Sequence, residues 1–387
     1  MHMGKTKLLL SMAFVLTSIG VSRSGQAQTF NVLYTFAGQP DGGTPHAGLV
    51  RDKAGNFYGT TLYGGAFNFG TVFEVNSSGT ETVLHSFTGA PGDGAYPYAE
   101  LIRDSAGNFY GTTSYGGASN HGTVFKMTAS GTETVLHSFT GKSDGALPYG
   151  SLIRDKTGNL YGTTYFSGTS GYGTLFKVTR NGTATVLHRF AGGAKDGALP
   201  YYTGLLMDKS GNVYGVTMEG GTSNLGVVYR FDKSNGLVVL HSFVGGVNDG
   251  CYPFGTLIQD AIGSLYGTTQ SCGSFDDGTV WRLTSSGSEA VLDHFAGGTN
   301  DGATPLAGVI RDDQGNLFGT TEFGGYVDVG ALYELSPNGT LTILRGFYYN
   351  TDGAYLVGGL IRDVQNNIYG TALKYGGGYG TVWQWSP

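Results

Sequence analysis

The chain has 387 residues, of which 69 are glycine and only 13% are charged. Glycine far exceeds ordinary usage, but no collagen-like triplet appears and aromatic residues reach 13%, so a collagen and a disordered chain are both excluded. The formal net charge is −6. This charge would repel a phosphate backbone, and we expect no nucleic-acid partner.

The N-terminal segment has the layout of a secretory signal peptide. Lys5 and Lys7 form a positive start, Leu8 to Val21 are mainly apolar, and Gly25-Gln26-Ala27 offers a cleavage site. A membrane anchor is the alternative, but the apolar stretch is shorter than the roughly 20 residues of a spanning helix. Cleavage after residue 27 would lower the basic count from 22 to 19 against 28 acids, a balance of −9. We predict an exported chain that does not span a membrane.

A sevenfold internal repeat follows the N-terminal segment. Its marker is a Gly-Asn-aromatic-Tyr-Gly-Thr-Thr phrase, and the tyrosine position of that phrase recurs every 51 to 53 residues. The position is held by Tyr58, Tyr110, Tyr161, Tyr214, Tyr266, Phe318 and Tyr369. An Asp-Gly pair keeps the same spacing, at Asp41, Asp93, Asp144, Asp196, Asp249, Asp301 and Asp352. In the first six copies a proline follows four residues after the aspartate.

Each period contains four runs with strand character, which in the second copy are Glu100 to Asp104, Asn108 to Thr113, Thr123 to Thr128 and Glu133 to Phe139. The first-to-second and third-to-fourth connections read as tight turns, and the other two connections are longer. Four short strands in about 50 residues are typical of a propeller blade. We predict an all-β, seven-bladed β-propeller over residues 28–387, with four antiparallel strands per blade.

The two ends of the chain predict how the ring closes. Six copies of the fourth run follow a third run, but the seventh, Phe30 to Phe36, precedes the first blade. The chain stops after a lone third run, Gly380 to Trp385. We predict that the N-terminal run completes the last blade beside it, which leaves no unpaired closing edge.

The repeat phrases resemble those of the bacterial GloVer tandem-repeat family, the choice-of-anchor repeat proteins. The matching phrases include Leu152-Ile-Arg-Asp-Lys-Thr-Gly-Asn-Leu-Tyr-Gly-Thr-Thr164 and Gly122-Thr-Val-Phe-Lys126, and the resemblance covers essentially the whole mature chain. It implies an exported, often surface-associated protein, and no catalytic residues. The chain ends at Ser386-Pro387 without a C-terminal anchor segment, so we expect free secretion. The Gly-Gly pairs also resemble kelch repeats, but the tryptophan of a kelch blade is missing.

Recurring histidines and aspartates are assigned to structure rather than to a metal site. His85, His137, His188 and His241 occupy the outermost strand, where residues one blade apart diverge beyond the bond lengths of zinc. The Asp-Gly aspartates recur identically, as turn caps would, without the dense oxygen spacing that calcium needs. We expect no metal and no cofactor.

The two cysteines, Cys251 and Cys272, lie 21 residues apart in blade five, on the two long connections. Export permits a disulfide between them, and two free thiols are the alternative. A Cα separation above roughly 7 Å would exclude the bond.

Differences between blades indicate a candidate ligand site near the channel mouth. Five consecutive blades carry a ring directly after the repeat proline, whereas blades six and seven have Leu306 and Val357; the ring residues are His46, Tyr98, Tyr149, Tyr201 and Phe254. The second-to-third connections of blades four to six carry acids that we interpret as unrepeated, Glu219, Asp276, Asp277, Glu322 and Asp328. We expect ligand contacts from Tyr98, Tyr149, Tyr201, Phe254, Glu219, Asp276, Asp277 and Glu322.

Three functions remain open. We favour a binding module for a carbohydrate or other extended polar ligand, because aromatic rings stack on sugar rings. A structural or protein-interaction scaffold at the cell surface is the first alternative. The second is a polysaccharide-cleaving enzyme with paired carboxylates from blades four to six, although no nucleophile motif is present. We expect a monomer with a glycan or surface-protein partner, and burial of the tyrosines between blades would favour the scaffold.

Overall fold

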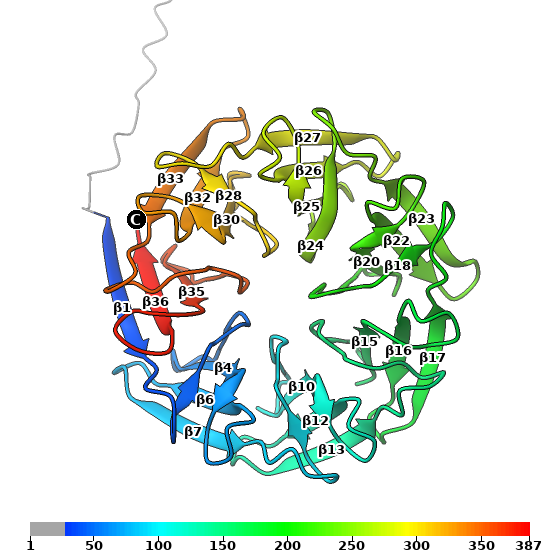
Figure 1. Ribbon diagram of the computed structural model, residues 1–387, viewed down its shortest axis with the longest axis vertical. Coiled ribbons are helices and arrows are strands. Elements are labelled where there is room, and N and C mark those ends of the chain that lie inside the picture. The colour runs from blue at the N-terminus through cyan, green and yellow to red at the C-terminus, as the bar shows by residue number, and fades with distance from the viewer. Residues whose placement is uncertain (1–27) are drawn as a thin grey trace, which may run out of the picture.

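The computed structural model describes residues 28–387, which form seven four-stranded antiparallel sheets around a central axis (Figure 1). This arrangement confirms the predicted seven-bladed β-propeller. The predicted signal peptide, residues 1–27, lies outside the described residues. Within residues 28–387 there is no helix, and so none that could cross a membrane.

The blades follow chain order, and the strands of each are given from the channel outward. Blade one consists of β3 (Val50–Arg51), β4 (Phe57–Thr61), β6 (Thr71–Val75) and β7 (Glu81–Ser86). Blade two consists of β9 (Ile102–Arg103), β10 (Phe109–Thr113), β12 (Thr123–Met127) and β13 (Glu133–Ser138). Blade three consists of β14 (Ile153–Arg154), β15 (Leu160–Thr164), β16 (Thr174–Val178) and β17 (Ala184–Arg189). Blades four and five are β19 (Leu206–Met207), β20 (Val213–Thr217), β22 (Val227–Asp232) and β23 (Gly236–Ser242); β24 (Gly250–Gln259), β25 (Leu265–Cys272), β26 (Thr279–Leu283) and β27 (Glu289–His294). Blades six and seven are β29 (Ile310–Arg311), β30 (Leu317–Thr321), β32 (Ala331–Leu335) and β33 (Leu341–Gly346); β34 (Ile361–Arg362), β35 (Ile368–Ala372), β36 (Thr381–Ser386) and β1 (Thr29–Thr35).

Four two-stranded sheets, each flanking the two inner strands of its blade in the sequence, extend the blades on the face of the long connections. They pair β2 (Gly42–Gly43) with β5 (Tyr63–Gly64), β8 (Gly94–Ala95) with β11 (Tyr115–Gly116), β18 (Gly197–Ala198) with β21 (Glu219–Gly220), and β28 (Gly302–Ala303) with β31 (Phe323–Gly324). Blade five has no separate two-stranded sheet, because its two inner strands, β24 and β25, are continuous through this region. A disulfide joins Cys251 to Cys272 there, with a Cα separation of 5.4 Å.

The innermost strands are shorter than predicted, because the inner segments of neighbouring blades approach one another at the channel. In blade two the expected run from Glu100 to Asp104 is reduced to β9. A Cβ atom on Gly48 of blade one would lie 2.8 Å from the carbonyl oxygen of Gly359 of blade seven. A Cβ atom on Gly308 would similarly clash with the backbone of Thr256. Glycine is therefore required at these two positions, where inner segments of different blades meet around the channel.

The two threonines of the repeated Gly-Thr-Thr phrase make different hydrogen bonds, one between neighbouring blades and one within a blade. The first threonine reaches the next blade, as Thr268 does by donating to the carbonyl oxygen of Ala307 at 2.9 Å. The second threonine binds within the blade, and Thr113 lies 2.8 Å from the hydroxyl of Thr123. The phrase is thus explained by structure, without a ligand.

The hydrophobic core lies between the blades rather than within them. One of the buried clusters joins Tyr58 and Phe87 of blade one to Leu101, Phe109 and Phe125 of blade two. Because each sheet packs face to face with the next, the core forms a ring around the axis. The channel at the centre is left to the connections.

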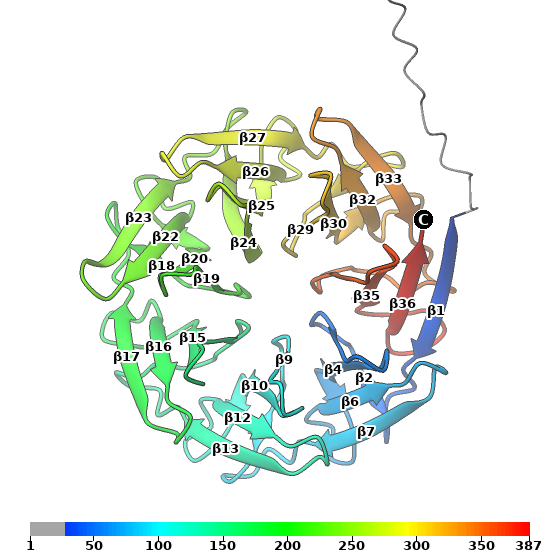
Figure 2. The same ribbon diagram turned by 180° about the vertical axis from the view of Figure 1, so that it is seen from behind.

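Strand β1 closes the ring as predicted. It pairs antiparallel with β36, from Thr29 opposite Ser386 to Thr35 opposite Thr381. In the view from behind, β1 lies on the outer side of β36 (Figure 2). The ring of Phe30 packs against Phe347 of blade six at 5.2 Å between centroids, so β1 also contributes to the interface between the last two blades.

Candidate functional site

The four histidines of the repeated Val-Leu-His phrase each pair with an Asp-Gly aspartate. The separations between the imidazole nitrogen and the carboxylate are 3.0–3.4 Å, for His85 with Asp93, His137 with Asp144, His188 with Asp196, and His241 with Asp249. The aspartates also cap their own turns, and Asp93 accepts a hydrogen bond from the backbone N–H of Gly94 at 2.7 Å. These contacts give both repeated residues a structural role.

One group among the described residues has the composition of a cation site. Ligand atoms of His241, Asp249 and Glu289 lie within 4.8 Å of one another. Burial raises the pKa of Glu289 to about 7, with the nearby Asp249 adding to the effect and His241 opposing it. The sequence analysis compared histidines of different blades and so overlooked a glutamate from the next blade. Glu133 stands beside Asp93 and His85 in the same way, which makes the grouping a feature of the blade interface.

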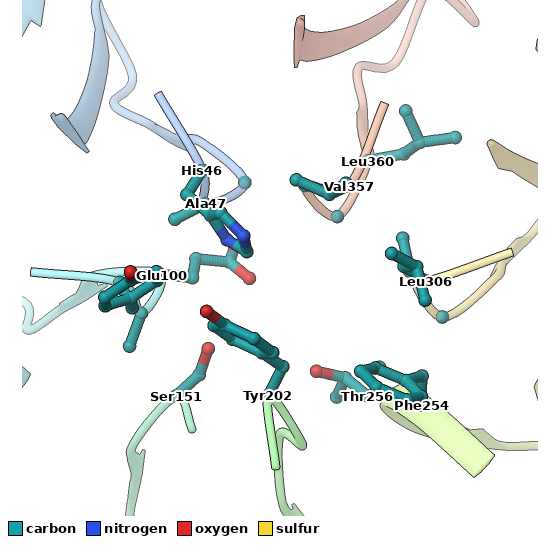
Figure 3. Close-up of a pocket in the computed structure, with 18 of the residues that line it drawn as sticks. His46, Ala47, Glu100, Ser151, Tyr202, Phe254, Thr256, Leu306, Val357 and Leu360 are labelled. Atoms are coloured by element: carbon teal, nitrogen blue, oxygen red, sulfur yellow. The ribbon is translucent and has the colours of Figure 1, made fainter. Parts of the chain in front are cut away.

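The central channel contains a cavity of about 430 Å³ whose wall has two chemically different halves (Figure 3). Blades six and seven contribute an aliphatic half that includes Leu306, Val357 and Leu360. The other half is aromatic and consists of His46, Tyr98, Tyr149, Tyr201, Tyr202 and Phe254. Ser151, Thr256 and Gln270 add polar groups to the wall.

The five ring residues predicted from the sequence form a crescent around this channel. Neighbouring rings meet edge to face, with centroids 4.9 Å apart for Tyr98 and Tyr149 and 5.2 Å apart for Tyr149 and Tyr201. Phe254 is buried, at 4% exposure, whereas the three tyrosines are half-buried and line the cavity. The tyrosines therefore pack on one another and also face the cavity.

Tyr202 is a cavity residue that the sequence analysis missed. In the other blades that have the repeat proline, the following leucine or valine comes four positions after it, but in blade four Leu205 comes five positions after Pro200. Tyr202 belongs to this one-residue insertion and has a φ of 49°, a conformation that costs an aromatic residue about 1–2 kcal/mol. Its ring reaches blade one and stacks on His46, at 4.7 Å and an interplanar angle of 22°.

Glu100 is the second cavity residue that the sequence analysis did not select. Its carboxyl group points into the cavity beside Tyr202 and His46 (Figure 3). No described residue donates a hydrogen bond to it, and burial raises the pKa of Glu100 to about 7. Burial also lowers the pKa of His46 to about 4. Both groups are largely uncharged at pH 6, when the carboxyl carries its proton and the imidazole does not.

The acids expected at the site lie outside the cavity wall. None of Glu219, Asp276, Asp277 and Glu322 lines it. Asp276 and Asp328 cap turns instead, accepting hydrogen bonds from the backbone N–H groups of Cys272 at 3.0 Å and Gly324 at 2.8 Å.

Asparagines in other blades make the same turn. Asn68, Asn120 and Asn224 also have positive φ, and each accepts a hydrogen bond from the backbone N–H four residues earlier. Asp276 and Asp328 therefore replace an asparagine at a repeated turn position, so the position is repeated and only the negative charge is particular to blades five and six.

The other three acids belong to the surrounding loops. Glu219 lies in β21 opposite Ala198. Burial raises the pKa of Asp277, and its neighbours Asp276 and Asp328 add to this. Burial also raises the pKa of Glu322, and Lys374 opposes the effect.

The fold and the repeated hydrogen bonds define a repeat β-propeller. The family model described as the Gloeobacter/Verrucomicrobia repeat matches residues 20–217 and 194–383. This chain belongs to that family, as the repeat phrases predicted. No curated protein matches the chain.

Solved structures share the propeller fold at low sequence identity. The extracellular domain of a candidate one component system from B. thetaiotaomicron has a TM-score of 0.58 at 11% identity, covering 91% of this chain; this chain spans 39% of that protein. A candidate 6-phosphogluconolactonase from Bacteroides fragilis has a TM-score of 0.52 at 17% identity, covering 84% of this chain and 88% of its own. At such identities the likeness concerns the fold alone.

Proposed function

We propose that this protein is an exported binding module that holds a small, ring-shaped ligand, such as a sugar unit, in the channel cavity. The observation that carries the proposal is the crescent of half-buried tyrosines facing the cavity. Tyrosine combines an apolar face with a hydroxyl, so it can stack on a sugar ring and bond to its hydroxyl groups. A cavity of about 430 Å³ suits one or two sugar rings better than an extended polymer.

Binding is favoured over catalysis because the cavity lacks a pair of carboxylates. Glycoside hydrolysis ordinarily needs two, about 5–10 Å apart, and Glu100 is the single acid in the wall. The acids of blades four to six, which an enzyme would have used, lie outside the wall. A scaffold function would not explain the strained backbone of Tyr202 or the cavity.

The proposal is tested by screening the purified protein on a glycan array and titrating the sugars that bind by calorimetry. Replacing Tyr149 by Ala at the centre of the crescent should weaken binding about three- to tenfold, because one aromatic contact is lost. Phe275→Ala is the matched control, since Phe275 is 61% exposed and lies outside the cavity wall. A sugar that binds the control and Tyr149→Ala equally well would place its site elsewhere.

A further inference from the structure

The acid in the cavity breaks the repeat at one blade only. Glu100 precedes the leucine that opens the inner strand of blade two. In the other blades this position holds a glycine or a small hydroxyl residue, namely Gly48, Ser151, Gly204, Thr256, Gly308 and Gly359. At Gly48 and Gly308 a Cβ atom would clash with the backbone of another blade, whereas at Gly359 the nearest atom would be an oxygen of Glu100, 3.6 Å away. A glutamate at this position is therefore an addition that the fold itself does not require.

The Glu100 carboxyl has no cationic partner among residues 28–387: no salt bridge involves it, and the described residues of the cavity wall include no lysine and no arginine. The carboxyl oxygen Oε2 extends towards blade seven, where a Cβ atom on Gly359 would lie 3.6 Å away. Glu100 is partly buried. A carboxylate that is withdrawn from water without a partner is costly, and this cost falls when a ligand brings a positive charge.

The surrounding rings select the kind of positive charge. The faces of tyrosine rings attract cations, most strongly when water is excluded. An inorganic cation such as calcium favours several carboxylate ligands, and Glu100 is the single acid among the described residues of the wall. A primary ammonium would bring three N–H donors, whereas an alkylated ammonium brings fewer and presents alkyl groups that suit the aliphatic half of the wall.

We propose that the cavity binds an alkylated ammonium compound, with its charged nitrogen between Glu100 and the tyrosine rings and its apolar part against Leu306 and Val357. This assignment rests on the cavity being the ligand site proposed above, and it specifies the chemical class. Tyr202 has a defined role in this arrangement, because its inserted ring and His46 enclose the aromatic end of the cavity.

The acid–base properties of the wall make the charge of Glu100 measurable. The other titratable groups in the wall are His46 and the four tyrosines, Tyr98, Tyr149, Tyr201 and Tyr202. Burial lowers the pKa of His46 to about 4 and raises the pKa values of Tyr98, Tyr149 and Tyr202. Glu100, with a pKa near 7, is therefore the group whose charge changes between pH 5 and 8.

The test compares two probes of the same shape by calorimetry on the purified protein. Choline carries a permanent positive charge, and 3,3-dimethylbutan-1-ol is its neutral carbon analogue. Choline should bind about tenfold more tightly at pH 8. This preference should shrink severalfold at pH 5, where Glu100 is protonated. Equal affinity of the two probes at pH 8 would overturn the proposal without the use of any variant.

Variants then assign the charge to one residue. Glu100→Gln should reduce the preference for choline severalfold at pH 8, to the level seen at pH 5, because the attraction of the tyrosine rings remains. The affinity for the neutral alcohol should stay within about twofold, since the shape is kept. Glu219→Gln, an acid outside the cavity wall, is the matched control and should keep the full preference. An undiminished preference in Glu100→Gln would overturn the assignment. Sugars that bind through Tyr149, without any choline preference, would leave the proposed function standing and the ammonium proposal refuted.

Discussion

Carboxyl groups in the repeat experience opposite electrostatic environments, according to whether the protein supplies hydrogen-bond donors. Burial alone would raise the pKa of Asp104, but hydrogen bonds from the side chain and backbone of Asn108 and from Tyr110 outweigh it and lower the pKa. At Glu289 burial prevails, and an oxygen of its carboxyl has no hydrogen-bond partner. The first kind of acid stabilises the fold when charged, and the second when protonated.

Replacing Glu289 by Gln should stabilise the protein at pH 8 and leave it nearly unchanged at pH 4.5. The folded-state pKa of about 7 exceeds the unfolded value of roughly 4.3, so the favourable contribution is complete below that value and is lost as the pH rises through 7. Allowing for partial exposure, the free energy of unfolding at pH 8 should rise by about 1–2 kcal/mol.

Urea unfolding at the two pH values measures the effect of Glu289→Gln. The exposed Asp313 supplies the control, as Asp313→Asn should change stability little at either pH. An equal gain from Glu289→Gln at both pH values would show that the carboxyl is not a buried charge.

Single residues were predicted where they follow the repeat and missed where they depart from it. The ring positions after the repeat proline were read correctly as lying at the channel. Tyr202 was missed, although its insertion accounts for the interval of 53 residues between Tyr161 and Tyr214. Glu100 was predicted to begin the inner strand of blade two, because the repeat pattern does not show which residues of that run form backbone pairs. Comparing the seven copies position by position, insertions included, would have found both residues.

At the scale of strands and hairpins, blade five differs from the others. Its strands β24 and β25 continue through the region where blades one, two, four and six have a separate sheet of two short strands. The Cys251–Cys272 disulfide joins these two strands at their outer end. Phe254 and Thr256, which border the cavity, lie in β24. The disulfide thus reinforces the segment that forms part of the cavity wall.

Reducing this disulfide should lower stability by about 3 kcal/mol, because a loop of roughly 20 residues is no longer closed in the unfolded chain. Urea unfolding with and without dithiothreitol measures the loss. A variant with both cysteines replaced by Ser should be as stable as the reduced protein and should not respond to dithiothreitol. An identical midpoint for the oxidised and reduced protein would contradict the prediction.

The residues of the tight turns made the second, third and fourth strands of each blade predictable. The bounds of the inner strand and the additional two-residue strands could not be predicted. Alternating apolar residues and tight turns placed β10, β12 and β13 within one or two residues of their observed bounds. In the inner run of blade two only Ile102 and Arg103 pair with the neighbouring strand, and the sequence pattern does not indicate where such pairing ends. The two-residue strands consist largely of glycine, which carries no strand pattern.

For the whole molecule, ring closure depends on a single strand from the other end of the chain. Deleting residues 28–36 would remove β1, expose the edge of β36 and remove Phe30 and Phe36 from the core. The free energy of unfolding should fall by more than about 4 kcal/mol, since removal of a buried phenylalanine such as Phe36 costs about 3–5 kcal/mol, and the strand pairing of β1 and the partly buried Phe30 are lost as well. The exposed edge should also promote association between molecules.

Urea unfolding and sedimentation measure the two effects of this deletion. Protein lacking only residues 1–27 is the control and should match the parent in both. A deleted protein that remains equally stable would show that β1 is dispensable for closure.

The number of blades and their closure were predictable because seven equal copies with one displaced strand allow few other arrangements. The division of the channel into an aromatic half and an aliphatic half was only partly predictable, since it depends on how far each side chain reaches across the axis. The seven blades form the channel, and Glu100 and Tyr202, which depart from the repeat, make one side of its wall chemically different from the other.

The pairing of β1 with β36 also sets an order of events in time. Thr29 is among the first residues of the described chain to be synthesised, and its partner Ser386 is among the last. Six blades have all their strands before residue 347, but the seventh must wait until nearly the whole chain is available. During that interval the apolar strand β1 has no native partner. A chain that is folding must therefore keep β1 from pairing with a neighbouring molecule until β36 has been synthesised.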